Sequence, residues 1–225
     1  HRISKALSYA FHICLRESMA PKVKELRKGF EAVQDLELLK VLKSEIEFEL
    51  NSNPFKIQAD KILGSLGDFS LDWDSPNSKD VVLRKKCNSG EEVAVSAILG
   101  PTPTHERGGA FPRDVLINVF VQKPALSSML QFNCRAFEES INEPEFDIKS
   151  AYYLPSSTCL GSSIYRGPKF GELDPELQDS IKNYLIDKGI GENLIMFLLH
   201  YLHKREHEQY INWLKKGNTF VAKSE

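Results

Sequence analysis

The residues that come closest to a catalytic motif lie at positions 203–207 and read His-Lys-Arg-Glu-His. In a helix, His203 and His207 lie about one turn apart on the same face, where two imidazoles can bind one zinc ion. The order HxxEH is that of the inverted zinc peptidases, in which the glutamate, here Glu206, is the general base. The motif therefore raises the hypothesis of a metal-dependent hydrolase.

A zinc site of this kind also needs a third protein ligand, usually an acidic residue further along the chain. After the motif the sequence offers only Glu208 and Glu225. Both histidines share a helical stripe with Tyr210 and Leu214, so packing, partner contact or hydrogen bonding accounts for them without a metal. We therefore predict no metal here and keep the hydrolase as the alternative.

Other catalytic and cofactor-binding patterns are missing from the sequence. There is no GxSxG nucleophile elbow, and residues 161–163 lack its spacing. Neither the P-loop nor the GxGxxG pattern occurs, and residues 189–191 fit a turn between helices. The sequence thus predicts a protein that is not an enzyme, has no cofactor and takes no small-molecule substrate.

The only compact basic cluster is Arg84-Lys85-Lys86, in a chain whose formal net charge is -2. It lacks an accompanying aromatic RNA-binding strand or zinc-finger spacing, so a solvated strand end is the simpler interpretation. A dedicated RNA-binding module that uses these three residues remains a second alternative.

The composition fits one domain over residues 1–225, because 41% of the residues are hydrophobic and enough apolar material is present for one substantial core. The four cysteines have no CxxC or disulfide-framework spacing, which favours a reducing compartment. The apolar run at residues 194–199 is far shorter than the roughly 20 residues of a membrane span. Residues 1–17 fit either the remnant of a transit peptide or a folded helix, and we favour the helix.

The hydrophobic pattern predicts helices at both ends of the chain and strands between them. Residues 21–50 fit a helix with a coiled-coil-like stripe, for which an ordinary amphipathic helix is the alternative. A period of two predicts antiparallel strands, and a Pro- and Gly-rich connection at 100–112 reads as a surface loop. The predicted strands cover residues 81–87, 91–99, 114–122, 129–136 and 146–154.

Two helices follow the strands. Asp174 and Pro175 start the first as N-cap and first helical residue, and Gly189 ends it. The second covers residues 191–216, and its first half is apolar almost all round, which predicts burial on several sides.

Three segments together resemble the mitochondrial glycoprotein family. The sequence YRGPKF at 165–170, followed by LDPELQ at 173–178, is similar to the family's YxGPxFxxLDxxLQ stretch. The similarity continues through residues 184–194 to KREHEQY at 204–210. Upstream, residues 111–123 and 130–134 resemble the family's sheet, and the helix near 31–50 resembles its N-terminal helix.

The resemblance implies an α+β fold with an N-terminal helix, a strongly twisted antiparallel sheet of about seven strands and two C-terminal helices. It further implies that the terminal helices pair like a coiled coil within a homotrimeric ring. The implied function is a non-enzymatic, chaperone-like binding protein of the mitochondrial matrix that supports mitochondrial gene expression and oxidative phosphorylation. Its implied partners are other copies of itself and mitochondrial proteins, the ribosome or RNA.

The expected subunit interface follows from the apolar residues of the two terminal helices and the ring architecture. The predicted interface residues are Leu36, Leu39, Ile46, Leu50, Leu194, Ile195, Leu198, Leu202 and Trp213.

The well-known family members are strongly acidic, whereas this chain has a pI of about 6.4, so a uniformly acidic binding face is not expected.

Overall fold

A computed structural model describes residues 25–26, 29–30, 33–52, 66–76, 78–101, 110–140, 143–156 and 165–222. The chain forms two compact units, one of residues 54–209 and one of residues 1–53 with 210–225. Most of the expected surface loop at 100–112, and all of residues 1–17, lie outside the described residues. No helix in the described part of the chain has the length and hydropathy of a membrane span.

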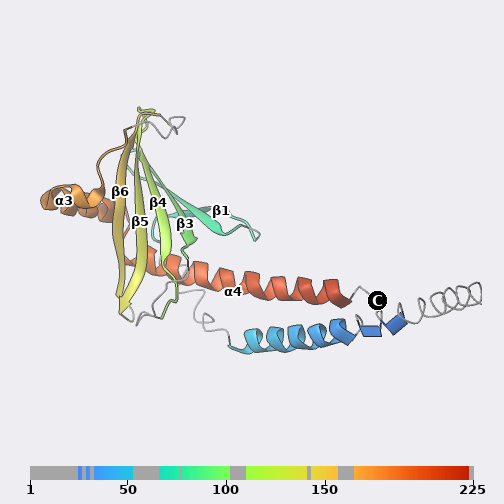
Figure 1. The fold of residues 1–225 in the computed structure, drawn as a ribbon. Helices are drawn as coiled ribbons and strands as arrows, with labels where there is room; N and C mark the ends of the chain where they lie inside the picture. Colours follow the sequence, from blue (N-terminus) through green and yellow to red (C-terminus); the bar gives the residue numbers. More distant parts are fainter. Residues whose placement is uncertain are drawn as a thin grey trace, which may run out of the picture. The chain divides into compact units, whose positions relative to one another are not determined.

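The unit of residues 54–209 is built on an antiparallel meander, in which each strand pairs with its neighbour in sequence (Figure 1). The described residues contribute six strands, against about seven expected. They are β1 (Ser70–Asp74), β2 (Asp80–Lys86), β3 (Glu92–Leu99), β4 (Val115–Gln122), β5 (Met129–Ser140) and β6 (Glu143–Leu154).

Alternation of apolar and polar residues puts one face of the sheet into the core. In β4, Val115, Ile117, Val119 and Val121 are buried, and the residues between them are half-buried or exposed. Register pairs Ile117 with Ala97 of β3 and Cys134 of β5, so buried residues line up across the sheet. We call this buried side the inner face.

The β2–β3 hairpin forms where the sequence predicts it. Gly90 has a φ of 83°, a left-handed conformation that glycine adopts without strain. Its N–H donates to the Cys87 carbonyl at 2.9 Å, and the Cys87 N–H donates to Glu91 at 2.8 Å. These bonds fix the register of the two strands.

Two predictions about strands need correction. β1 was not predicted: it has only two apolar residues, Leu71 and Trp73, and all five of its residues are exposed. β6 begins at Glu143 and contains Pro144, whereas the predicted strand begins only at residue 146. Within the described sheet β6 is an edge strand, where a proline without an N–H is tolerated.

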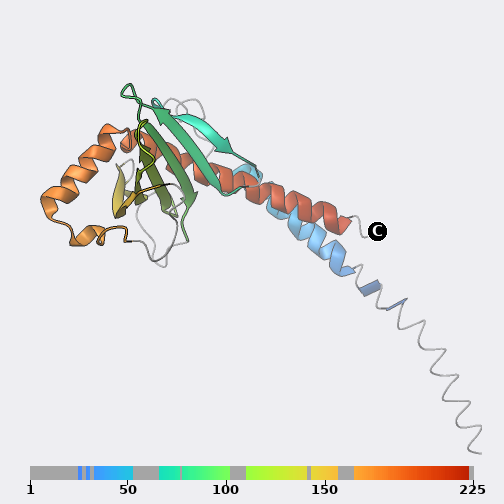
Figure 2. The same cartoon turned by 90° about the horizontal axis from the view of Figure 1, so that it is seen from above.

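Two helices complete the unit: α3 (Pro175–Asp187) and the first part of α4 (Glu192–Ala222). The Asp174 carboxylate accepts a hydrogen bond from the Glu176 N–H at 3.0 Å, which confirms the predicted N-cap. Gly189, with a φ of 96°, follows the end of α3 as predicted. Figure 2 shows the first part of α4 running beneath the sheet in a second view.

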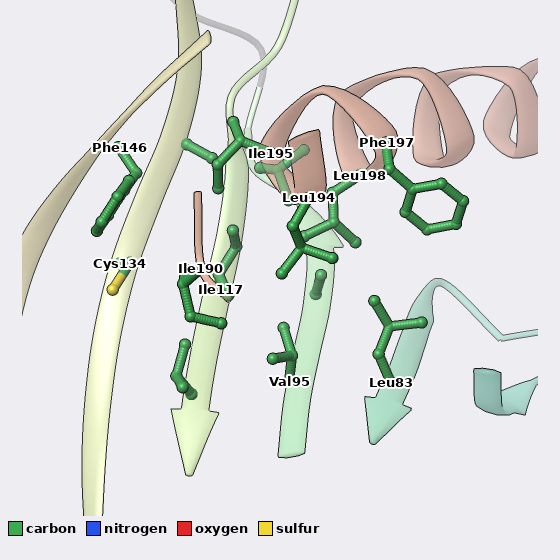
Figure 3. Close-up of a cluster of buried hydrophobic side chains, with 14 of the residues drawn as sticks. Leu83, Val95, Ile117, Cys134, Phe146, Ile190, Leu194, Ile195, Phe197 and Leu198 are labelled. Atoms are coloured by element: carbon green, nitrogen blue, oxygen red, sulfur yellow. The ribbon is translucent and has the colours of Figure 1, made fainter. Parts of the chain in front are cut away.

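The core lies between the inner face and the first half of α4 (Figure 3). Leu194, Ile195 and Leu198 reach from the helix toward Val95 and Ile117, and all five are at most 2% exposed. Cys134 is buried in the same cluster, and burial raises the pKa of its thiol to about 12. This cysteine therefore packs as a small apolar side chain.

Candidate functional site

The histidine motif on α4 is engaged in structural contacts. His203 is 2% exposed, and its Nδ1 lies 2.7 Å from the Leu199 carbonyl, so this nitrogen is the donor. The ring of Phe111 packs against His203 and His200, with ring centroids 5.1 and 4.7 Å apart. Burial lowers the pKa of both histidines.

The glutamate of the motif forms an ion pair with Arg113, whose Nε also donates to the Gly100 carbonyl at 2.6 Å. Arg113, just before β4, thereby links α4 to the backbone that directly follows β3. Among the described residues, no three His, Cys, Asp or Glu side chains are placed to hold one metal ion. His203 and Glu206 thus fasten the segment around Phe111 to α4.

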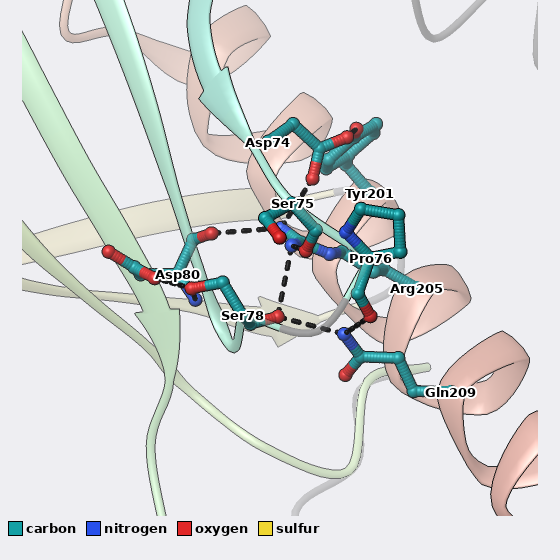
Figure 4. Close-up of polar contacts among 8 residues, drawn as sticks. All are labelled: Asp74, Ser75, Pro76, Ser78, Asp80, Tyr201, Arg205 and Gln209. Carbon is teal, nitrogen blue, oxygen red and sulfur yellow. Dashed lines mark hydrogen bonds and ion pairs between the residues drawn. The ribbon is translucent and has the colours of Figure 1, made fainter.

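Arg205, inside the same motif, organises a polar cluster that the sequence did not predict (Figure 4). Its guanidinium is 2.7 Å from the Asp74 carboxylate and donates to the Asp80 and Ser78 carbonyls, each at 2.9 Å, and to the Ser75 carbonyl. Arg205 is 8% exposed. One buried cation therefore satisfies several acceptors of the β1–β2 turn.

Two neighbours on α4, each one turn from Arg205, complete this Arg205 cluster. Gln209 Nε2 donates to the Pro76 carbonyl at 2.9 Å and to the Ser78 carbonyl at 2.8 Å. The Tyr201 hydroxyl donates to Asp74, and burial together with this bond raises the pKa of Tyr201 to about 12. The only sequence signal was the spacing of Tyr201, Arg205 and Gln209 by four residues, which puts them on one helical face.

The three basic side chains of β2, at residues 84–86, do not all lie on the same face of the sheet. Alternation points Arg84 and Lys86 to the face opposite Lys85. Arg84 Nε pairs with Asp72 at 2.6 Å, and this hydrogen bond raises its pKa. Lys85 pairs with Asp68 at 3.2 Å and lies 5.7 Å from the centre of the Phe69 ring. The three residues therefore do not form one basic surface, because pleating separates them and acids neutralise two of them.

The predicted interface residues of α4 divide into two groups. Leu194, Ile195, Leu198 and Leu202 are buried in the core of a single chain, so the sheet already covers their surface. Their predicted contact with the N-terminal helix stays a prediction. Trp213 is 65% exposed and stacks on Tyr210, with ring centroids 6.1 Å apart.

The other unit holds the N-terminal helix, residues 33–52, beside the last part of α4 (Figures 1 and 2). The Tyr210 hydroxyl donates to Glu45 at 3.1 Å. Leu39, Leu42 and Ile46 are half-buried. The stripe is centred toward Leu42, so the predicted residues Leu36 and Leu50 lie at its margin and are exposed.

A second apolar stripe, on the helical residues 25–26, 29–30 and 33–52, was not predicted. Its members recur at spacings close to one or two helical turns, on the side away from Leu39 and Ile46. Each is more than half exposed. We call it the outer stripe, and it consists of Leu26, Phe30, Val33, Val41 and Phe48.

The fold defines this chain as an α+β protein of the p32 type. A *Leishmania major* protein of unknown function, described as a sequence homologue of human p32, superimposes with a TM-score of 0.65 at 19% identity, covering 84% of this chain and 99% of that one. The *Trypanosoma brucei* p22 protein gives a TM-score of 0.66 at 20% identity with the same coverage.

The sequence comparisons name the family. Residues 111–221 match the family model described as mitochondrial glycoprotein. Mitochondrial acidic protein mam33 of *Schizosaccharomyces pombe* is 35% identical over 95 residues, which are 38% of this chain and 35% of that protein. An uncharacterized mitochondrial protein of *Arabidopsis thaliana* is 24% identical over 192 residues, 82% of this chain and 74% of that protein. The chain belongs to the mitochondrial glycoprotein family, as the sequence motifs indicated.

Proposed function

We propose that this chain is a non-enzymatic binding protein of the mitochondrial matrix that assembles as a homotrimer and supports mitochondrial gene expression and oxidative phosphorylation. Family membership and the mitochondrial names of its relatives support the location and the binding role. The observation that carries the proposal is the outer stripe, because each of its five apolar side chains is more than half exposed in the part of the chain that the structure describes.

An exposed apolar stripe of this kind marks a surface for another protein. Trp213 and Phe220 add two exposed aromatic rings within the same unit. Copies of the chain that cover these residues would form a permanent, largely hydrophobic interface, for which roughly 2,000 Å² or more per pair is usual. The terminal helices would then pair in the manner of a coiled coil across the assembly.

The binding role is tested by recovering partners from mitochondria with the tagged chain, with and without nuclease. Co-purification of the same proteins in both samples supports direct protein binding. Loss of every partner after nuclease would point instead to an RNA-binding module. Absence of the tagged precursor from the matrix fraction would contradict the proposed location.

The metal-dependent hydrolase is tested by the zinc content of the purified protein. We expect less than stoichiometric zinc and no change of melting temperature with a chelator, because the Glu206 carboxylate is paired with Arg113 and His203 Nδ1 with a backbone carbonyl. One equivalent of zinc that is lost in His203→Ala would establish the metal site and overturn this prediction.

A further inference from the structure

An apolar groove lies at the end of the inner face that α3 borders. Its volume is about 460 Å³, within the roughly 300–1,000 Å³ usual for small-molecule sites. Its lining comes from strands β5 and β6, from α3 and from the segment before α3. The lining residues are Leu130, Phe132, Ala151, Tyr152, Tyr153, Arg166, Gly167, Pro168, Leu173, Leu177, Ser180, Ile181 and Tyr184.

The chain reaches the groove through a close approach to β6. Gly167 has a φ of 121°, and a Cβ atom at this position would lie 3.2 Å from the Ala151 carbonyl oxygen. A side chain here would therefore push the segment away from the strand. This approach sets Arg166 beside β6, with its guanidinium carbon 5.8 Å from the centre of the Tyr152 ring.

The charge of the groove lining is positive only. Arg166 is the only charged residue among the described residues that line the groove, and no carboxylate is present. A guanidinium has five N–H donors, so it can bind an anion in addition to its contacts within the chain. An apolar surface with one cation at its margin selects a ligand with an apolar body and one negative charge.

We propose that this groove binds a free monocarboxylate with an apolar tail, of the fatty-acid type. The tail lies between Leu130 and Leu177, and the carboxylate is bound by Arg166. Binding is reversible and involves no chemical step. This goes beyond the proposed binding of macromolecules and adds a ligand that the sequence did not indicate.

Calorimetry on the native, fully assembled protein tests the proposal with decanoate, decanol and decyltrimethylammonium, which share a tail and differ in charge. We expect saturable binding of decanoate, about tenfold tighter than that of decanol, because one charge-assisted hydrogen bond is gained. Arg166→Gln should remove this difference, and Leu177→Asp should abolish binding. Binding of decyltrimethylammonium as tight as that of decanoate, or no saturable binding of decanoate, would overturn the proposal.

The structure offers two matched controls. Ile186 lies on the same helix as Leu177 and is 45% exposed against 47%, but it does not line the groove. Lys169 lies three residues after Arg166 and is also outside the lining. Ile186→Asp and Lys169→Gln should bind decanoate like the wild type. If Leu177→Asp binds decanoate normally, or changes the mass of the assembly in light scattering, the groove is not a ligand site and the proposal fails.

Discussion

Arg205 holds the β1–β2 turn with a charge that is almost completely withdrawn from water. The cost of burying a guanidinium is offset only when its donors are satisfied, and here backbone carbonyls satisfy most of them. The partners lie more than 120 residues away in sequence and are mostly main-chain atoms. The pattern of residue types in the sequence cannot indicate main-chain partners so far away. This is why the cluster was not predicted from the sequence.

The first prediction is that Arg205→Ala destabilises the fold by about 3 kcal/mol, because it leaves Asp74 and the turn carbonyls without their donor. Urea unfolding measures the loss. The control is Lys204→Ala, which removes an exposed pair with Glu208 at 3.8 Å and should cost at most about 0.5 kcal/mol. Equal effects of both variants would show that the cluster adds nothing to stability.

The second prediction concerns pH. Burial lowers the pKa of His200 and His203 below the unfolded value, so the unfolded chain binds more protons below about pH 6.5. Their contribution to stability is complete above that pH and is lost as the pH falls toward their folded pKa values.

Several charged groups surround these rings: Glu138 raises the pKa of His200, and for His203 Glu206 raises it while Arg113 lowers it. Urea unfolding at pH 5.5 and 7.5 should show a smaller difference for a His200→Asn, His203→Asn double variant than for the wild type. An unchanged difference would assign the acid sensitivity to other groups.

At the scale of elements, sequence reasoning succeeded where periodicity was strong. The predicted bounds of β2 to β5 differ from the observed ones by few residues, except at the end of β5, because buried and exposed side chains alternate along these strands. In β1 all five residues are exposed, so burial does not alternate along it. The strand is held in the sheet by its pairing with β2. The groove could not be predicted from the sequence either, because its lining residues come from three separate elements, β5, β6 and α3.

The third prediction separates core from surface on the two terminal helices. Leu198→Ala should destabilise the chain by about 2–5 kcal/mol, because the side chain is fully buried against the sheet. Leu36→Ala removes a side chain that is 58% exposed and should cost less than about 1 kcal/mol in a single chain. Chemical denaturation of both variants below the concentration at which subunits associate measures this difference, and similar losses would contradict the assignment.

At the scale of the whole molecule, the fourth prediction is the oligomeric state. Light scattering at micromolar concentration should give about three times the 25.5 kDa mass of one chain, because association with other copies removes the exposed apolar side chains of the outer stripe from water. Phe48→Asp should lower the mass, whereas Glu47→Gln, an exposed neighbour on a different side of the helix, should not. A single-chain mass for the wild type, with its helices intact by circular dichroism, would exclude the obligate trimer.

The sequential order of the strands affects how the chain folds while it is being synthesised. In the described sheet, each strand after β1 pairs with the strand synthesised just before it, so the meander can assemble while the chain is being made. The residues that cover its inner face, on α4, come last. Until they arrive, a growing sheet exposes valines and isoleucines from several strands, which is the state most prone to aggregate. We therefore expect chains truncated before α4 to aggregate or be degraded rather than to accumulate as folded protein.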